Sequence, residues 1–451
     1  MSRQVSPLLT DLYQLNMIQA YLDCGETQDA TFELFVRKLP SRRQFLLAAG
    51  LEQALEYLEN IRFAPEDIDW LAKTGKFKQN LLDYLRSFEF TGEVHAMKEG
   101  TIFFGNEPIL RITAPLPQAQ LVETRLINLL QFQTLIATKA SRIVLAAPGK
   151  LLVDFGLRRA HGSEAGLLAA RASYICGFAG TATVLAEKEF GIHTYGTMAH
   201  SYVQAHDNEM TAFEHFARSR PNQPTLLIDS YDTLKAAHKV VALSKKLKSD
   251  GITIGAVRID SGDVITLSRQ VRQILDAGGV PDIKIFVSGG LEEDSISSIV
   301  AAAAPIDGFG VGTTLTTSSD APSLDCAYKL EEYGGRARRK RSAGKVTWPG
   351  SKQVFRKIAG NGRMAGDTLA RVDETVDGEP LIHPVMSAGK RLSAPPTLTQ
   401  IREHAARELE RLPPPLRKLD TTAYYNVTVS PALTRLADEV DRWLIKQEHV
   451  L

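Results

Sequence analysis

The sequence predicts an α/β protein: an irregular, TIM-like (β/α) barrel, with a second α+β domain built from the N-terminal region and C-terminal segments. Three observations predict this class. Short apolar runs recur along the middle of the chain, and helical patterns follow most of them. The later runs lie roughly 23 to 30 residues apart, which is the length of one strand plus one crossover helix. Unusual polar residues and glycines gather just after the runs.

The first part of the chain, residues 1–125, is expected to form an N-terminal α+β domain. Apolar residues at helical spacing predict helices in LLTDLYQLNMIQAYLDCG and LLAAGLEQALEYLENI. Strand-like segments are interleaved with them, namely ATFELFVRKL, FTGEVHAMKEG and EPILRITAPL.

The middle part, residues 126–335, is expected to form the barrel. The runs that predict strands are KLLVDFG (150–156), IHTYG (192–196), TLLIDSYD (225–232), IGAVRIDSGD (254–263), IKIFVSGG (283–290) and PIDGFGVGT (305–313). The segments that predict helices are TATVLAEKEFG, DTLKAAHKVVALSKKLKSDG, DVITLSRQVRQILDAGG and EEDSISSIVAAAA. Continuous apolar strands such as LLVDF are typical of parallel sheets that are covered on both faces.

The last part, residues 336–451, is expected to pack on the N-terminal domain. It holds strand-like pieces and a charged helical region, which PPP interrupts at 413–415. Its basic run RARRKR (336–341) suits a solvated or locally paired loop, a phosphate contact or a nuclear-type signal, and we favour the first.

The position of the polar residues favours a closed barrel over an open doubly wound sheet. Barrels build their sites from the loops after all their strands, whereas a doubly wound sheet concentrates the chemistry at one or two crevices. The residues found just after strands are Arg158, His161, His200, Asp229, Arg258, Asp260, Asp263, Ser288, Gly289, Gly312 and Thr313.

Composition excludes several classes of protein. Lys plus Arg number 53 and Asp plus Glu 52 in 451 residues, so the chain lacks the basic excess of a nucleic-acid binder. Three widely spaced cysteines exclude a disulfide framework and a cysteine-rich zinc site. The sequence shows neither a signal peptide nor an apolar run of roughly 18 residues that would span a membrane. We therefore expect a cytoplasmic protein with no membrane or nucleic-acid partner.

Two kinds of loop suit an anion. DFGLRRAHG (154–162) carries Arg158 and His161, and adjacent guanidinium groups bind phosphate or carboxylate, although a solvated turn is the plain alternative. VSGG and GVGT follow the last two strands, where glycines let a phosphate approach backbone N–H groups. The residues of these two turns are Ser288, Gly289, Gly290, Gly312 and Thr313.

RIDSGD (258–263) places one arginine and two carboxylates in a single loop. Asp260 and Asp263, with Asp229 after the preceding strand, could orient ribose hydroxyls or hold Mg²⁺ together with substrate phosphates. Asp263 could equally cap the helix that follows. Arg258 follows an apolar strand and would be partly buried without an anion.

His200, in GTMAHSYVQAH (196–206), has three interpretations. Pairing with His206 in a zinc site fails, because the spacing does not suit a helix and a third ligand is missing, so we expect no dedicated protein-only metal site. A packed core imidazole is the plain alternative. The third interpretation is a phosphoryl acceptor. The position of His200 on the first turn after a strand, on the same rim as the phosphate loops, favours it.

Together these motifs resemble one family, the nicotinate phosphoribosyltransferases of the type II phosphoribosyltransferase group. The segments that carry the resemblance are LLTDLYQLNMIQAYL, FELFVRKLP, LLQFQTLIATKASRI, DFGLRRAHG, GTMAHSYVQAH, IDSYDTL, RIDSGD, IFVSGGL, FGVGTTL and PGSKQVFRK. They follow one another in consistent order between positions 8 and 358, and the last part of the chain matches only loosely.

The resemblance implies an irregular α/β barrel with an N-terminal domain, in a homodimer with sites near the subunit interface. It implies an enzyme of NAD biosynthesis that joins nicotinate to phosphoribosyl pyrophosphate, giving nicotinate mononucleotide and pyrophosphate. ATP is hydrolysed as a co-substrate, and Mg²⁺ accompanies the substrate phosphates.

The resemblance also assigns roles to residues. His200 would be phosphorylated by ATP, and Tyr13, Thr197 and Arg258 would contact nicotinate. Thr313 would contact phosphoribosyl pyrophosphate, with Arg158, Gly289 and Gly290 as companions. Two alternatives stay open, a nicotinamide phosphoribosyltransferase of the same fold and a catalytically silent metabolite-binding relative.

Overall fold

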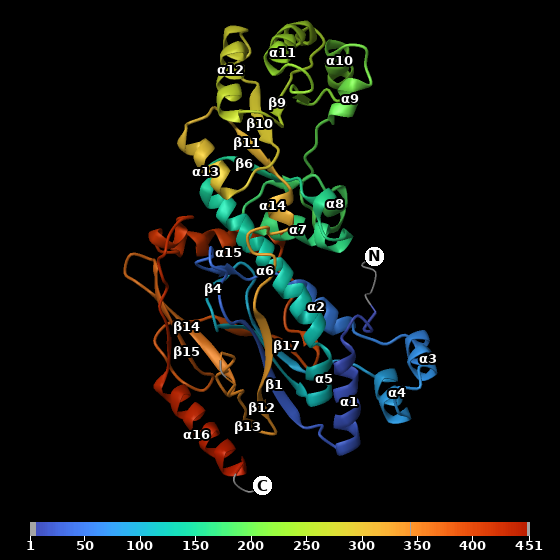
Figure 1. The fold of residues 1–451 in the computed structure, drawn as a ribbon, viewed down its shortest axis with the longest axis vertical. Helices are drawn as coiled ribbons and strands as arrows, with labels where there is room; N and C mark the ends of the chain where they lie inside the picture. The colour runs from blue at the N-terminus through green and yellow to red at the C-terminus, as the bar shows by residue number, and fades with distance from the viewer. Residues whose placement is uncertain (1–5, 343, 449–451) are drawn as a thin grey trace. The chain divides into compact units, whose positions relative to one another are not determined.

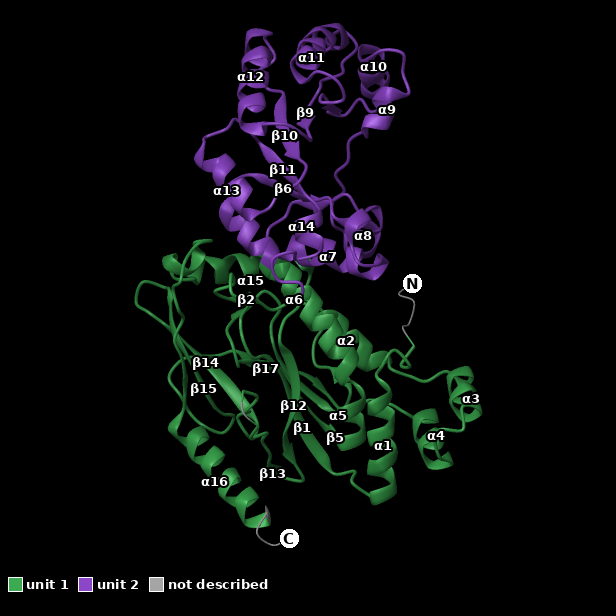
Figure 2. Cartoon of the chain, in the orientation of Figure 1, with its two compact units in different colours: residues 1–138, 323–451 green, residues 139–322 purple. Residues whose placement is uncertain are grey.

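The computed structural model describes residues 6–342 and 344–448 and divides the chain into two compact units. Unit 1 comprises residues 1–138 and 323–451, and unit 2 comprises residues 139–322 (Figure 2). The chain first passes from unit 1 to unit 2 within the long helix α6 (Glu123–Ala146).

Unit 2 is built on a six-stranded sheet with the order β7-β6-β11-β10-β9-β8, in which every pair is parallel (Figure 1). Its elements are β6 (Leu151–Asp154), η1 (Leu157–Arg159), α7 (Ser163–Ile175), β7 (Gly180–Thr181), α8 (Val184–Phe190), α9 (His200–Gln204), α10 (Glu209–Ser219), β8 (Thr225–Leu227), α11 (Thr233–Lys248), β9 (Ala256–Ile259), α12 (Val264–Ala277), β10 (Lys284–Ser288), α13 (Glu293–Ala301), β11 (Gly308–Val311) and α14 (Thr313–Thr316). The central strands β10 and β11 are almost wholly buried, as expected for parallel strands covered on both faces.

The predicted closed barrel is not confirmed. Closure requires a backbone ladder between the two edge strands, and within the described residues none joins β7 to β8. The expected strand at IHTYG contributes only a single bridge, from Thr194 to Thr181. Between residues 191 and 199 only Ile192 and Met198 are buried, so this stretch gains little apolar burial from joining the sheet. The parallel α/β sheet is present, but it is open.

Unit 1 combines segments from both ends of the chain in a seven-stranded antiparallel sheet with the order β13-β12-β1-β5-β3-β17-β18. A four-stranded sheet has the order β16-β14-β15-β19, and β2 pairs with β4. The strands are β1 (Asp29–Val36), β2 (Leu46–Leu47), β3 (Glu93–Met97), β4 (Ile102–Phe103), β5 (Pro108–Pro115), β12 (Cys326–Tyr333), β13 (Arg336–Ala337), β14 (Lys352–Ile358), β15 (Met364–Arg371), β16 (Glu379–Pro380), β17 (Ile382–Ser387), β18 (Lys390–Arg391) and β19 (Val427–Val429).

Helices accompany these sheets. They are α1 (Leu12–Cys24), α2 (Leu51–Asn60), α3 (Pro65–Lys73), α4 (Gln79–Arg86), α5 (Leu116–Leu121), α15 (Leu398–Arg411), η2 (Pro414–Arg417) and α16 (Pro431–Glu448). The basic run 336–341 is locally paired: Arg339 and Arg341 both reach Asp441 of α16, at 3.3 and 3.5 Å. Within the described residues no helix is long and apolar enough to cross a bilayer.

Candidate active site

Arg258, on β9 of unit 2, is the centre of a polar cluster at the carboxyl end of the parallel sheet. Its Nε donates to Ser288 Oγ and its Nη2 to Asp260 Oδ1, both at 2.8 Å. Its Nη1 donates to Thr197 Oγ1 at 2.8 Å and to the carbonyl of Met198 at 3.4 Å. These bonds hold the guanidinium plane in one orientation, since Arg carries its donors in a rigid fork.

The carboxylate of Asp260 joins the loops after β8, β9 and β10. Its Oδ1 accepts from the Arg258 guanidinium and from the hydroxyl of Ser288, and its backbone N–H donates to Asp229 Oδ2 at 2.9 Å. Burial raises the pKa of Asp260, but the hydrogen bonds from Ser288 and Arg258 outweigh it, and the net pKa is lowered. The Ser261 hydroxyl donates to the same Asp229 oxygen at 2.6 Å.

His200 begins α9 and lies beside this cluster. Its Nδ1 is 3.0 Å from the Ser230 hydroxyl, and its Nε2 is 4.0 Å from Asp260 Oδ2. With 39% of its side chain exposed, the imidazole is accessible to a substrate while one ring nitrogen is held in place. When Nδ1–H donates to Ser230, the lone pair of Nε2 is free to act as a nucleophile.

The two glycines after β10 have backbone conformations that other residues adopt poorly. Gly289 has φ +92°, and a Cβ on it would lie 2.0 Å from the carbonyl oxygen of Asp260. Gly290 has φ +62° and open space around it. Gly312 caps α14, and Thr313 is exposed on the first turn of that short helix.

The other predicted residues do not join the cluster. Arg158 and His161 are exposed, on η1 and just after it. Asp263 has the plainer of its two predicted roles, because it caps α12 by accepting from the N–H groups of Ile265 and Thr266. Hydrogen bonds from Thr266, first from its hydroxyl and then from its backbone N–H, lower the pKa of Asp263. Tyr13 is exposed on α1 of unit 1.

Sequence reasoning missed two serines of the cluster, although a signal for them exists. The tripeptide Ile-Asp-Ser follows β8 at positions 228–230 and begins on the last residue of β9 at positions 259–261. Each aspartate of this repeat lies in the cluster, and Ser230 and Ser261 bond to His200 and Asp229.

Two further residues, Asp154 at the end of β6 and Phe155 just after it, were not predicted as site residues, although Asp154 flanks the predicted arginine segment. Asp154 accepts hydrogen bonds from the Thr181 hydroxyl at 2.7 Å and from the N–H of Gly156 at 2.8 Å. It thereby connects β6 to β7 and to the segment 154–162 that carries Arg158. Burial raises its pKa to about 6, against the lowering effect of these two bonds. The ring centroid of Phe155 is 5.7 Å from Cζ of Arg258.

Comparison with known families gives three matches along the chain. Residues 8–131 match the nicotinate phosphoribosyltransferase (NAPRTase) N-terminal domain, residues 151–344 the NAPRTase family domain and residues 374–437 the C-terminal domain. The chain is 47% identical to nicotinate phosphoribosyltransferase pncB2 of Mycobacterium tuberculosis over 430 residues, which cover 95% of this chain and 92% of the relative. It is 42% identical to the Bacillus subtilis nicotinate phosphoribosyltransferase, over 84% of this chain and 79% of the relative.

Solved structures agree. The crystal structure of human nicotinic acid phosphoribosyltransferase matches with a TM-score of 0.87 at 28% identity, covering 96% of this chain and all of that one. The nicotinate-nucleotide pyrophosphorylase from Pyrococcus furiosus matches with a TM-score of 0.73 at 26% identity, covering 90% of this chain and 95% of that one. The resemblance carried by the sequence motifs is thus confirmed, and the chain belongs to the nicotinate phosphoribosyltransferase family.

Proposed function

We propose that this protein joins nicotinate to phosphoribosyl pyrophosphate, giving nicotinate mononucleotide and pyrophosphate for NAD salvage, and that ATP hydrolysis drives the reaction through a phosphorylated His200. Family membership supports the overall reaction. The observation that carries the coupling is the hydrogen-bonded cluster of Arg258, Asp260 and Ser288 with the accessible imidazole of His200 beside it.

Arg258 is suited to the carboxylate of nicotinate. Its four hydrogen bonds use four of the five N–H groups of a guanidinium and leave one, on Nη2. The Thr197 hydroxyl accepts a hydrogen bond from the other terminal nitrogen, Nη1, and so lies next to this free N–H group. The carboxylate would accept from both, and Tyr13, which the family resemblance assigns to nicotinate, would stack on the pyridine ring.

The transfer step needs positioning more than a protein nucleophile. The pyridine nitrogen donates its electron pair to the anomeric carbon, the bond from that carbon to the pyrophosphate oxygen breaks, and pyrophosphate leaves with the bonding pair. Positive charge develops on the ribose ring, so fixed carboxylates at Asp229 and Asp260 would stabilise it. The phosphates would be held by backbone N–H groups and a hydroxyl at Gly289, Gly290, Gly312 and Thr313. Arg158 and His161 lie in the segment that follows β6, the first strand of unit 2.

The coupling step uses the free ring nitrogen of His200. Nε2 attacks the terminal phosphorus of ATP, the bond to the bridging oxygen breaks, and ADP leaves with the electron pair. Water later attacks the same phosphorus, which releases inorganic phosphate and restores the imidazole. While it lasts, the phosphoryl group adds close to two negative charges beside the cluster. We propose that this charge orders the basic groups around the phosphoribosyl donor.

The residues present fit Mg²⁺ held together with substrate phosphates. Asp229 Oδ1 is buried and has no hydrogen-bond partner in the part of the chain that the structure describes, so a carboxylate oxygen is free for a cation. In the same residues no group of three or more His, Cys, Asp or Glu could hold a metal alone, and Mg²⁺ usually keeps substrate phosphates among its ligands. When bound, the ion would neutralise charge on the leaving pyrophosphate.

The proposal is tested by measuring nicotinate mononucleotide formation with and without ATP in the wild type and in His200→Ala. We expect the variant to lose ATP stimulation and to keep a slow ATP-independent reaction, because the transfer step does not use the imidazole. Labelled ATP should leave acid-labile, base-stable phosphate on the wild type and none on the variant. His206→Ala is the matched control, since the His206 ring bonds to the Tyr202 carbonyl and packs on neighbouring rings, away from the Arg258 cluster's hydrogen bonds.

Full ATP stimulation in His200→Ala would show the coupling to be wrong. Turnover of nicotinate and nicotinamide at equal concentration separates the acid-using enzyme from the amide-using alternative, and absence of turnover with either would favour the silent relative.

A further inference from the structure

A basic pocket of about 420 Å³ lies in unit 1, between the turn that joins β14 to β15 and the carboxyl end of α15. Its lining residues are Asn361, Gly362, Arg363, Arg407, Glu410, Arg411 and Arg417, and we call it the arginine pocket. Four guanidinium groups therefore face one carboxylate.

Three short segments bring these arginines together. In the turn, Asn361 Oδ1 accepts from the N–H of Arg363 at 3.0 Å, and Gly362 supplies a φ of +76°. Arg407 and Arg411 lie four residues apart on α15, so they share one face of the helix. Arg417, on η2, folds back and donates to the Leu409 carbonyl at 2.6 Å.

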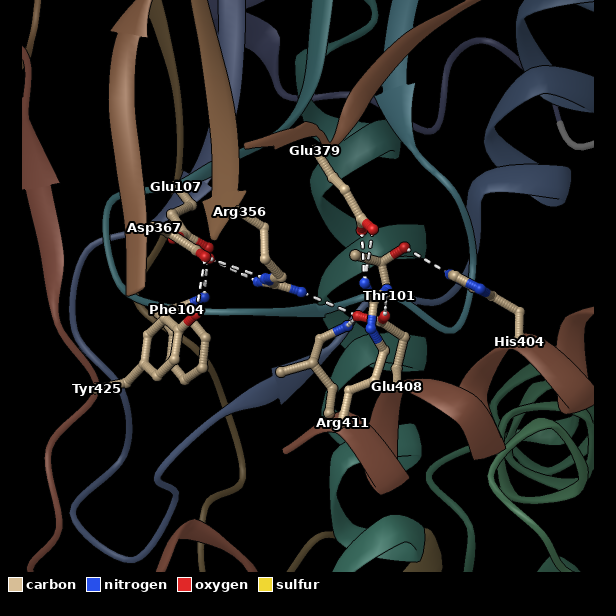
Figure 3. A network of polar contacts seen from close by, with 11 residues as sticks. Thr101, Phe104, Glu107, Arg356, Asp367, Glu379, His404, Glu408, Arg411 and Tyr425 are labelled. Carbon is tan, nitrogen blue, oxygen red and sulfur yellow. Dashed lines mark hydrogen bonds and ion pairs between the residues drawn. The ribbon is translucent and has the colours of Figure 1, made fainter. Parts of the chain in front are cut away.

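Arg411, which lines the pocket, belongs to a network of ion pairs that continues to buried residues (Figure 3). Arg411 pairs with Glu379 at 2.7 Å and with Glu408 at 3.2 Å. Glu408 in turn pairs at 2.9 Å with Arg356, which also pairs with Asp367 at 2.6 Å, and all three are buried. Arg411 is thereby held in place before any ligand arrives.

The other three arginines are not compensated in this way. Within residues 6–342 and 344–448, the side chains of Arg363 and Arg407 make no hydrogen bond or ion pair. Arg417 Nε is buried and has no hydrogen-bond partner in the part of the chain that the structure describes. Burial, followed by the charge of Arg363, lowers the pKa of Arg417, whereas Glu410 acts in the opposite direction. Like charges held this close repel one another until an anion enters.

Helix polarity accounts for only part of this arrangement. Cations near the carboxyl end of a helix are favourable, so α15 alone would attract Arg411 and Arg417. It gives no reason for Arg363, which comes from a different element and is turned toward the same space.

We propose that the arginine pocket binds a small phosphate-bearing anion, of the class of phosphate monoesters and diphosphates. Guanidinium forks bind phosphate oxygens in pairs. The unpaired forks of Arg363 and Arg407, with the Arg417 guanidinium beside them, suit a ligand with several such oxygens. A volume of about 420 Å³ falls within the range of small-molecule sites. This site belongs to unit 1, whereas the Arg258–His200 cluster belongs to unit 2, so the proposal stands apart from the proposed activity.

The first test is protection from an arginine reagent in the full chain, with inorganic pyrophosphate as the probe. Phenylglyoxal labelling is followed peptide by peptide, which separates this pocket from the proposed active site. With pyrophosphate at ten times its dissociation constant, labelling of Arg363 and Arg407 should slow about tenfold. The exposed Arg435 of α16 should react at the same rate with and without the probe. Unchanged labelling of Arg363 and Arg407 would overturn the proposal, and equal protection by succinate would overturn its preference for phosphate.

The second test is a calorimetric titration of pyrophosphate into the wild type, the double variant Arg363→Gln/Arg407→Gln and the control Arg435→Gln. The side chains of Arg363 and Arg407 have no hydrogen-bond or ion-pair partner to lose among the described residues, so the double variant should fold. We expect it to bind pyrophosphate in this pocket about tenfold or more weakly, because charge-assisted hydrogen bonds are removed. Isotherms that match in all three proteins would contradict the proposal even if the reagent cannot reach the pocket. Nicotinate mononucleotide formation, measured in parallel, reports separately on the proposed activity.

Discussion

A lysine at position 258 could not replace the arginine, because a single ammonium group cannot span the partners that the guanidinium joins. Ser288, Thr197 and Asp260 come from three different loops, and Arg258 donates to all of them. The orientation of the one remaining N–H therefore depends on the other four.

We predict that Arg258→Lys raises the KM for nicotinate and lowers kcat/KM by about 10- to 100-fold, the cost of losing one or two hydrogen bonds to a charged group. Steady-state kinetics with nicotinate as the varied substrate measures this. The control is Arg218→Lys, an exposed arginine paired with Glu214 and Asp250, where little change is expected. An unaltered kcat/KM in Arg258→Lys would remove Arg258 from the nicotinate site.

At the residue scale, position at or just after the carboxyl end of a strand was enough to pick out Arg258, Asp260 and Ser288, because parallel strands bring these ends to one edge. The same rule selected Asp263, whose side chain only caps a helix. Residue type and spacing do not distinguish a loop side chain that turns toward the sheet from one that turns to its own helix. The direction of a loop side chain depends on backbone angles such as the positive φ of Gly262, and the local sequence pattern does not predict these angles.

Between elements, the loops after β9 and β10 touch through backbone atoms at Gly289. We predict that Gly289→Ala destabilises the protein by about 2 to 4 kcal/mol, because left-handed strain adds to a backbone clash. Gly290→Ala is the control, since it carries the strain without the clash, and should cost about 1 to 2 kcal/mol. Urea denaturation at constant pH measures both. Equal losses in the two variants would mean that the Asp260 carbonyl moves aside freely.

For a related reason, the sequence pattern could not show whether the predicted barrel closes. The prediction of a strand depends on apolar residues in a short window, and IHTYG contains few of them. Whether such a segment joins a sheet depends on a partner edge far along the chain, and here Thr194 makes only one bridge. Successive βα units predict that neighbouring strands along the chain pair, but they do not predict whether the two edge strands pair with each other.

Another element-scale feature is Lys352 of β14, which lies between two buried carboxylates. Its Nζ is 2.9 Å from Glu33 of β1 and 3.8 Å from Glu331 of β12. Burial raises the pKa of Glu331 to about 8, the charge of Lys352 opposes this and that of Glu33 adds to it. One lysine thus neutralises one carboxylate, and the second keeps a proton in the folded state.

This predicts a pH-dependent stability with a definite sign. Unfolded, Glu331 titrates near 4.5, and folded it titrates near 8, so between these values the folded state binds more protons. The free energy of unfolding should therefore fall as pH rises from about 4.5 to about 8, and level off above. Urea midpoints across this range should fall less in Glu331→Gln. Glu332→Gln, at the next position, should keep the wild-type slope, and the same slope in Glu331→Gln would refute the assignment.

At the scale of the whole molecule, the residues proposed for nicotinate and for phosphorylation are divided between the two units. Tyr13 belongs to unit 1, whereas Thr197, Arg258 and His200 belong to unit 2. The family resemblance implies a homodimer with sites near the subunit interface. A site completed by two subunits would take its unit 1 residues from one chain and its unit 2 residues from the other.

This arrangement predicts that two impaired variants restore ATP-stimulated activity when mixed. Tyr13→Ala and His200→Ala, unfolded together in equal amounts and refolded, should give about a quarter of the wild-type ATP-stimulated activity, because half of the dimers are mixed and each holds one undamaged site of two. Each variant refolded alone supplies the baseline, and light scattering measures the dimer. If each site lay within one chain, every site in the mixture would carry a lesion, and the mixture would be no more active than the average of the two variants. Recovery of ATP-stimulated activity in the mixture therefore distinguishes a site shared between two chains from a site contained in one chain.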